Sequence, residues 1–229
     1  MQLSRIQYVS LIAAATLLAS CRSPQAASPP VPNGGDDDGI RVTTNAKAIA
    51  EARSDSMSRP YVAADVAFMT GMVGHHAQAI EMSELAPDRG ASAAVQRLAA
   101  RIINAQRDEI TLIQQWLADR QKPIPPATSM THAGGHAHHA MMSGMLSPDQ
   151  MRQLASSRGT EFDRLFLTFM IQHHQGAVAM VKELFSTPGA GQDHTVFKFA
   201  SDVNVDQTTE INRMQQMLAS LPSTQPNQP

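Results

Sequence analysis

A motif of methionine and histidine occurs twice in the sequence. In one-letter code it reads F-x-x-x-M-x-x-H-H-x-x-A-[IV]-x-M, and its copies begin at Phe68 and Phe166, a shift of 98 positions. Imidazole nitrogen and thioether sulfur together suit copper, since thioether favours Cu(I) and imidazole accepts either oxidation state. The doubled histidine pair therefore favours metal binding over a purely structural polar layer, although the methionines taken singly fit core packing equally well.

A second group of the same side chains lies between the two copies of the motif. This run has no apolar periodicity, so we expect a mobile loop in which histidine and methionine have no packing role. The ligand chemistry again favours copper over a plain linker. The candidate ligands of this loop are His132, His136, His138, His139, Met130, Met141, Met142 and Met145.

The motif has a simple meaning on a helix, where positions three and four apart share one face. Its phenylalanine, methionine, first histidine and alanine then form one apolar stripe, and the second histidine lies at the edge of that stripe. Periodicity and breakers predict helices over 61–85, 92–119, 160–185 and 193–221, with a short helix capped by Ser147 before the third. Each hairpin has one apolar face that it cannot bury alone. The sequence therefore predicts an all-α fold, a four-helix bundle made of two repeated helical hairpins.

Polar residues interrupt the stripes of the second and fourth predicted helices. A buried amide or carboxylate costs about 1–3 kcal/mol without a partner, so these side chains should bond the buried histidines. A satisfied polar network that only sets helix register is the alternative. The residues expected to orient the histidines are Gln106, Glu109, Gln207 and Glu210.

Composition narrows the class of protein. The formal net charge of −2 offers no basic footprint for nucleic acid, and the aromatic content of 4 % is low for a β-sandwich or barrel. The single cysteine, Cys21, excludes a disulfide framework and a thiolate metal site within one chain.

The N-terminus resembles a bacterial lipoprotein signal. Arg5 precedes an apolar run that is too short for a stable membrane anchor, and Leu18-Ala19-Ser20-Cys21 reads as a lipobox. We expect cleavage before Cys21, lipidation of that cysteine and attachment to the cell envelope facing the periplasm, at the outer rather than the inner membrane. An ordinary secretory signal is the alternative.

These signals divide the chain into four parts. The expected parts are a signal peptide (1–20), a flexible tether (21–59), the bundle domain (60–221) and a disordered tail (222–229). Within the bundle domain, hairpin one covers 60–120, the Met/His-rich loop 121–146 and hairpin two 147–221.

The two motifs, each followed by Q-x-x-E-I on the next helix, resemble the domain-of-unknown-function family 305, which includes CopM-like periplasmic copper-binding proteins. The resemblance covers roughly Tyr61 to Leu221. It implies a ferritin-like four-helix bundle and a role in copper tolerance or handling. Carried over by position, the implied ligands are Met72, His75, His76, Met82, Met170, His173, His174 and Met180.

Three functions remain open at this point. The favoured one is an exported, lipid-anchored protein that sequesters copper or hands it to a partner protein, without catalysis. A ferritin-like di-metal redox protein is less favoured, because such sites use four carboxylates and Glu-x-x-His pairs that are missing here. A structural lipoprotein without metal is the third.

Overall fold

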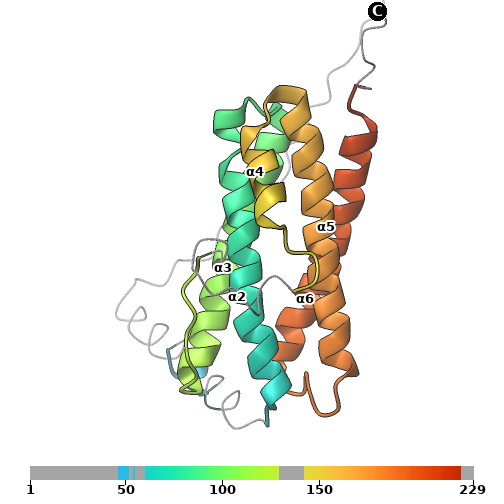
Figure 1. Ribbon diagram of the computed structural model, residues 1–229. Coiled ribbons are helices and arrows are strands. Elements are labelled where there is room, and N and C mark those ends of the chain that lie inside the picture. The colour runs from blue at the N-terminus through green and yellow to red at the C-terminus, as the bar shows by residue number, and fades with distance from the viewer. Residues whose placement is uncertain (1–45, 52–53, 55–59, 129–141, 223–229) are drawn as a thin grey trace, which may run out of the picture. The chain divides into compact units, whose positions relative to one another are not determined.

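The computed structural model describes residues 46–51, 54, 60–128 and 142–222 (Figure 1). The predictions for the signal peptide, Cys21, most of the tether, residues 129–141 and the tail beyond 222 lie outside the described residues. The regular structure of the described ranges is entirely helical, which confirms the predicted all-α class.

Two helical hairpins build the bundle. Helices α2 (Ala63–Glu84) and α3 (Ala93–Asp119) form the first, with the 3-10 turn η1 (Pro87–Arg89) between them. Helices α5 (Gly159–Ser186) and α6 (His194–Ala219) form the second, and the short helix α4 (Pro148–Ser156) precedes α5. The two hairpins meet along α2 and α5, as predicted for a bundle of repeated hairpins (Figure 1).

Side-chain caps fix where the helices begin. Ser92, Ser147 and Asp193 accept backbone N–H groups from the first turns of α3, α4 and α6, so the predicted cap at Ser147 is confirmed. In α2 the direction is reversed, because Asp65 of the first turn accepts from the N–H of Val62, the residue before the helix, at 2.8 Å.

Two further bonds join one hairpin to the other. The second carboxylate oxygen of Asp65 accepts from the N–H of Gly191, in the turn before α6, at 2.7 Å. Asp163 of α5 accepts from the N–H of Ser92, at the start of α3, at 3.1 and 3.2 Å. Because each aspartate belongs to one hairpin and its donor to the other, we call these contacts the inter-hairpin ties.

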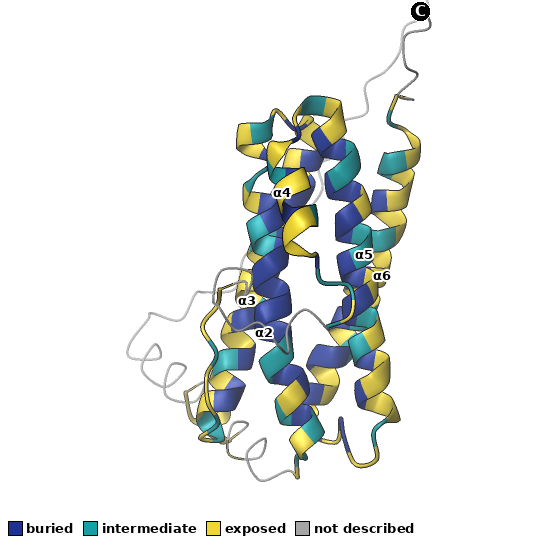
Figure 2. Cartoon of the chain, in the orientation of Figure 1, coloured by how far each residue is buried: buried dark blue, intermediate teal, exposed yellow. Residues whose placement is uncertain are grey.

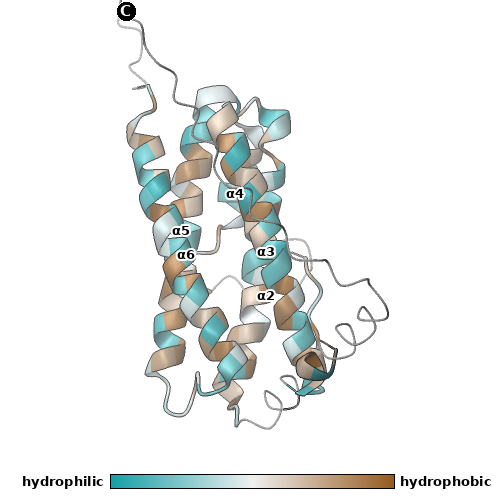
Figure 3. Cartoon of the chain, turned by 180° about the vertical axis from the view of Figure 1, so that it is seen from behind, coloured by the Kyte–Doolittle hydropathy of each residue, from teal (hydrophilic) through white to brown (hydrophobic). Residues whose placement is uncertain are grey.

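The core consists of two apolar clusters. One contains Phe162 and Phe166 and the other contains Phe68 and Trp116. Residues 72–79 of α2 are buried on every side, which Figure 2 shows as continuous dark blue along the middle of that helix. Helices α3 and α6 instead alternate hydrophilic and hydrophobic residues around their circumference (Figure 3). The histidine pairs therefore lie on the two most enclosed helices.

The expectation of a mobile loop is wrong for residues 142–146. The N–H of Leu146 donates to the Gln78 side-chain oxygen at 2.7 Å, and the Gln78 amide donates to the Leu146 carbonyl at 3.1 Å. This segment also lies so close to α5 that a Cβ added at Gly176 would stand 2.0 Å from the Ser143 carbonyl oxygen. The last residues of the Met/His-rich run are thus packed on the bundle.

None of the helices in the described ranges is long and apolar enough to cross a membrane.

Candidate metal centre

Four imidazole rings form a row across the middle of the bundle, in the order His76, His75, His173, His174. All four residues are 0 % exposed. The ring centroids of His75 and His173 are 3.9 Å apart, and each outer ring is 6.3–6.4 Å from its neighbour. The two copies of the motif therefore bring their first histidines into direct contact.

Adjacent positions on a helix point about 100° apart, which explains the row. On α2, His75 faces α5 while His76 faces α3, where its Nε2 lies 2.8 Å from the Glu109 carboxylate. The second hairpin repeats this arrangement, since His173 faces α2 and His174 Nε2 bonds Glu210 of α6 at 2.7 Å. The His76–Glu109 pair is a close contact without hydrogen-bond alignment, whereas the His174–Glu210 pair is aligned.

Several nitrogens of the four imidazole rings form no hydrogen bond to the described part of the chain. His75 Nε2 lies 3.1 Å from the Ser143 carbonyl, so this nitrogen carries the proton and Nδ1 keeps its lone pair. Among the described residues, the Nδ1 atoms of all four histidines have no hydrogen-bond partner, and His173 lacks one at Nε2 as well. Buried polar atoms are almost always paired in folded proteins, so these nitrogens are open to a water molecule or to a ligand.

The central rings are held neutral. Burial, followed by the neighbouring His76, lowers the pKa of His75 from 6.5 to about 3, against the raising effect of the Ser143 carbonyl. Burial, followed by the nearby His75, likewise lowers the pKa of His173 well below 6.5. A neutral imidazole is the form that binds metal ions, so the central pair does not need to release protons first.

The polar residues of α3 and α6 have divided roles. Glu109 and Glu210 contact the outer rings, as described above. The side-chain oxygen of Gln106 and both polar atoms of the Gln207 side chain are buried without a hydrogen-bond partner among the described residues, so the Gln207 amide bonds no histidine there. These four side chains line a groove of about 310 Å³ between α3 and α6. Burial, followed by neighbouring Asp202, raises the pKa of Asp206 at the edge of this groove.

The motif methionines lie in different environments. Met72 and Met170, one turn before the central histidines, are 0 % exposed, as is Met82. Met180 is half-buried, and so are Met142 and Met145 of the loop. The other candidate loop ligands, Met130, His132, His136, His138, His139 and Met141, lie outside the described residues.

Within the described ranges, no three side chains of histidine, cysteine, aspartate and glutamate converge into a metal-binding group. The central pair supplies two imidazoles, and the motif methionines on the same helical faces supply sulfur. This donor set fits a soft ion of low coordination number better than a hard ion that needs six oxygens.

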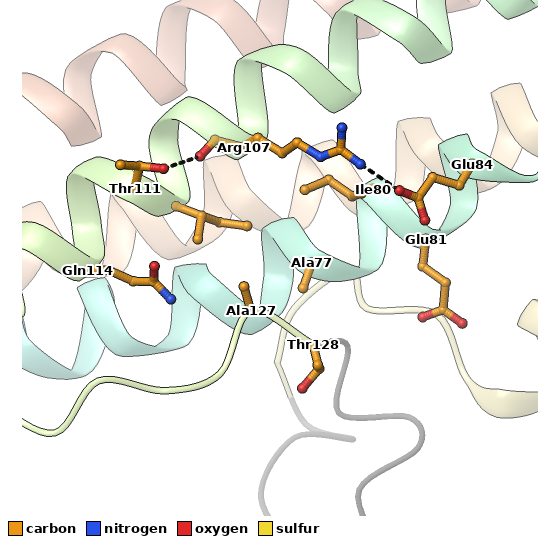
Figure 4. Close-up of a pocket in the computed structure, with 10 residues that line it drawn as sticks. Ala77, Ile80, Glu81, Glu84, Arg107, Thr111, Gln114, Ala127 and Thr128 are labelled. Atoms are coloured by element: carbon orange, nitrogen blue, oxygen red, sulfur yellow. Dashed lines mark hydrogen bonds and ion pairs between the residues drawn. The ribbon is translucent and has the colours of Figure 1, made fainter.

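A larger cavity of about 780 Å³ lies away from the histidines, on the outer side of α2 and α3 (Figure 4). Its lining combines apolar residues with Glu81, Glu84 and Arg107, and Arg107 donates to Glu84 at 2.7 Å. None of its described lining residues is a histidine or a methionine.

Three residues that support the centre were not identified from the sequence. Ser143 acts through its backbone carbonyl, which any residue carries, so the amino-acid type at this position does not indicate the contact with His75. Gln78 and Gly176 occupy equivalent positions in the two copies of the motif. Gln78 bonds the 142–146 segment, and Gly176 leaves room for it against α5. The difference between glutamine in one copy and glycine in the other was the sequence signal for this contact.

Known proteins resemble the chain over the bundle. Residues 65–218 match the model of the family described as "Domain of unknown function (DUF305)". A DUF305 structure from Streptomyces coelicolor is 28 % identical, with a TM-score of 0.59, and the match covers 72 % of this chain and 98 % of that one. A DUF305 fragment from Deinococcus radiodurans is 29 % identical, with a TM-score of 0.60 and coverages of 71 % and 99 %.

A third similar structure is CopM in its Cu(II)-bound form. It is 32 % identical, with a TM-score of 0.54, and the match covers 68 % of this chain and 95 % of that one. CopM has also been solved in Cu(I)-bound and silver-bound forms. No curated protein sequence matches the chain.

Proposed function

We propose that this chain, which belongs to the DUF305 family, binds copper between the two halves of its helical bundle. The observation that carries the proposal is the contact of His75 and His173. Their rings are 3.9 Å apart and fully enclosed, and three of their four nitrogens have no hydrogen-bond partner within the described ranges.

The chemistry of this pair favours Cu(I) as the bound form. The rings are neutral because burial depresses their pKa values, and Met72 and Met170 offer thioethers one turn away. Soft sulfur ligands select Cu(I), and few ligands converge here, which suits an ion that accepts low coordination. Copper-bound and silver-bound forms of the similar CopM support the same ion class.

The outer histidines have a different role in this proposal. His76 and His174 each contact a glutamate that holds the ring in place, so they extend the site from the central pair towards the α3–α6 groove. A dinuclear iron or manganese site draws less support, because Glu109 and Glu210 approach different histidines.

The cellular role is proposed from the sequence. The lipobox at Cys21 favours an exported protein anchored by lipid on the periplasmic side of the envelope, outer membrane rather than inner. There the protein would sequester copper or pass it to a partner protein, without catalysis.

Competition titration with a chromophoric Cu(I) chelator tests the proposal. The wild-type protein should bind copper more tightly than about 10 µM, and a His75→Leu/His173→Leu variant should bind at least one ion fewer. The exposed His194 provides the control, since His194→Gln should bind as the wild type does. Equal stoichiometry and affinity in the wild type and the double variant would overturn the buried site.

A further inference from the structure

The two copies of the motif differ at one position that controls access to a methionine. Gly71 of the first copy corresponds to Phe169 of the second. Phe169 belongs to the same apolar cluster as Met82, which is 0 % exposed. Met180, the counterpart of Met82, is half-buried, and a glycine stands where a phenyl ring would cover it. The two halves of the bundle therefore differ, because the thioether of Met180 is accessible and that of Met82 is not.

A second thioether reaches the same place. A Cβ added at Gly71 would lie 3.4 Å from the Met142 sulfur and 3.4 Å from the Met180 methyl carbon. Met142 belongs to the segment before α4 and Met180 to α5, so two elements converge on this point of α2. We call the space between Gly71, Met142 and Met180 the Gly71 notch.

The notch opens onto a cavity of about 760 Å³, whose lining includes Gly71, Thr70 and Met142. Among the described residues that line this cavity there is no carboxylate and no imidazole, and the cationic residue Lys122 lies over the Tyr61 ring. Thioether sulfur is therefore the soft donor available, and hard divalent cations find no anionic oxygen.

We propose that Met142 and Met180 form a solvent-accessible thioether site for Cu(I) at the Gly71 notch. The inference rests on the proposed function, because it assumes that copper is the ion the protein handles. Gly71 lies four residues before His75 on α2, so the site is about 6 Å along the helix axis from the central imidazole pair. An ion held at the notch is thereby positioned to reach the buried histidines.

The alternative is that both methionines only fill space, as flexible thioethers often do. The two possibilities differ in what a soft ion does to the methyl groups. A shared ion would shift both methyl signals in one binding event, whereas packing alone would leave them unchanged.

The experiment uses protein labelled with 13C at the methionine methyl groups, titrated with Ag(I) as a redox-inert stand-in for Cu(I). NMR signals of Met142 and Met180, assigned with the single leucine variants, should shift together with one apparent affinity. In Met142→Leu the remaining Met180 response should weaken roughly tenfold or more, as expected when one of two chelating ligands is lost. Separate affinities for the two methyls, or no shift in either, would overturn the proposal.

Two further variants complete the test. Gly71→Phe gives the first copy of the motif the phenylalanine that the second copy has at Phe169, and it should abolish the response of Met180. If the Gly71→Phe variant does not fold, the Met142→Leu variant alone decides the question. Met214→Leu, at a buried methionine of α6 that belongs to neither motif, is the control and should leave the response of the notch unchanged.

The His75→Leu/His173→Leu variant separates this proposal from the proposed function. If the methyl signals of Met142 and Met180 still shift together in this double variant, the result supports the thioether site at the Gly71 notch, even if no histidine-dependent binding exists. Histidine-dependent binding without a paired methyl response overturns the notch and leaves the buried site standing.

Discussion

His173 is enclosed by protein, and within the described part of the chain neither of its ring nitrogens forms a well-aligned hydrogen bond. Such an atom costs about 1–3 kcal/mol relative to a paired one, so the metal-free protein retains an unfavourable arrangement at its centre. A bound soft ion would give the nitrogen a partner. Stability and ligand binding are thereby linked at a single side chain.

The lowered pKa of His75 predicts how the metal-free protein responds to acid. Burial lowers the pKa from 6.5 to about 3, so below 6.5 the unfolded chain takes up a proton that the folded chain refuses. The free energy of unfolding should then fall as the pH drops from 6.5 towards 3, by up to about 1.4 kcal/mol per pH unit for this residue. Above 6.5 the ring is neutral in both states and contributes no pH dependence.

Urea unfolding of metal-free wild type and His75→Leu, compared between about pH 7 and about pH 4, measures this contribution. The difference in unfolding free energy between the two proteins should change with pH in favour of the variant as the solution becomes more acidic. Parallel pH profiles would show that His75 is not held neutral by the fold.

At the residue scale, the sequence predicts which side chains are buried better than it predicts their hydrogen-bond partners. Helical spacing placed the histidines among core residues and gave them glutamate or glutamine partners. In the structure the glutamates contact the outer rings, whereas the Gln207 amide has no hydrogen-bond partner among the described residues and so does not hold His173. Spacing gives the face of a side chain to within a turn, whereas hydrogen bonding depends on differences of an ångström between neighbouring helices.

At the scale of elements, the 142–146 segment positions the site as much as the helices do. Its Ser143 carbonyl fixes the proton on His75, and Gln78 bonds the Leu146 backbone in both directions. The contact at Gly176 requires the absence of a side chain. This segment makes one face of the bundle different from the other.

The Gly176 contact predicts an asymmetric response to alanine. Gly176→Ala would place a Cβ 2.0 Å from the Ser143 carbonyl oxygen, so the segment must move and the His75–Ser143 bond should be lost. We expect a loss of about 1–3 kcal/mol in unfolding free energy, measured with urea, and faster hydrogen exchange at the Leu146 amide.

Gly71→Ala is the matched control, because its Cβ would meet side-chain atoms at 3.4 Å. A helical glycine with that room should gain up to about 1 kcal/mol when replaced by alanine. Similar losses in both variants would contradict the special role of Gly176.

The four long helices could be predicted from sequence to within two residues, because apolar periodicity and breakers agree there. Residues 142–146 could not. They are small and polar with no period, and they are held by one glutamine and one glycine of other helices. Such long-range contacts leave no local pattern.

At the scale of the whole molecule, the inter-hairpin ties hold the two histidine pairs at the same level. Asp65 and Asp163 occupy equivalent positions in the repeat, and each accepts a backbone N–H from the opposite hairpin. Their separation of 98 positions equals that of the two histidine motifs. The repeated aspartates therefore join the two hairpins through two reciprocal hydrogen-bond contacts.

Replacing either aspartate should loosen the union of the hairpins. Asp65→Ala and Asp163→Ala each remove a buried charged acceptor, for which we expect a loss of about 1.5–3 kcal/mol in unfolding free energy. Asp149→Ala, at a side chain that is 82 % exposed, should change stability by less than about 0.5 kcal/mol. Denaturant unfolding of the three variants decides the matter, and equal effects at all three positions would contradict the ties.

Both flanks of residues 129–141 are fastened to the bundle. On one side the Gln114 amide donates to the Pro125 carbonyl at 3.3 Å, and on the other Gln78 grips Leu146. Doubling the length of a closed chain segment costs only about 0.6 kcal/mol. Changes in the number of residues between these anchors should therefore leave the bundle intact, so the fold places little constraint on how many histidines and methionines the sequence carries there.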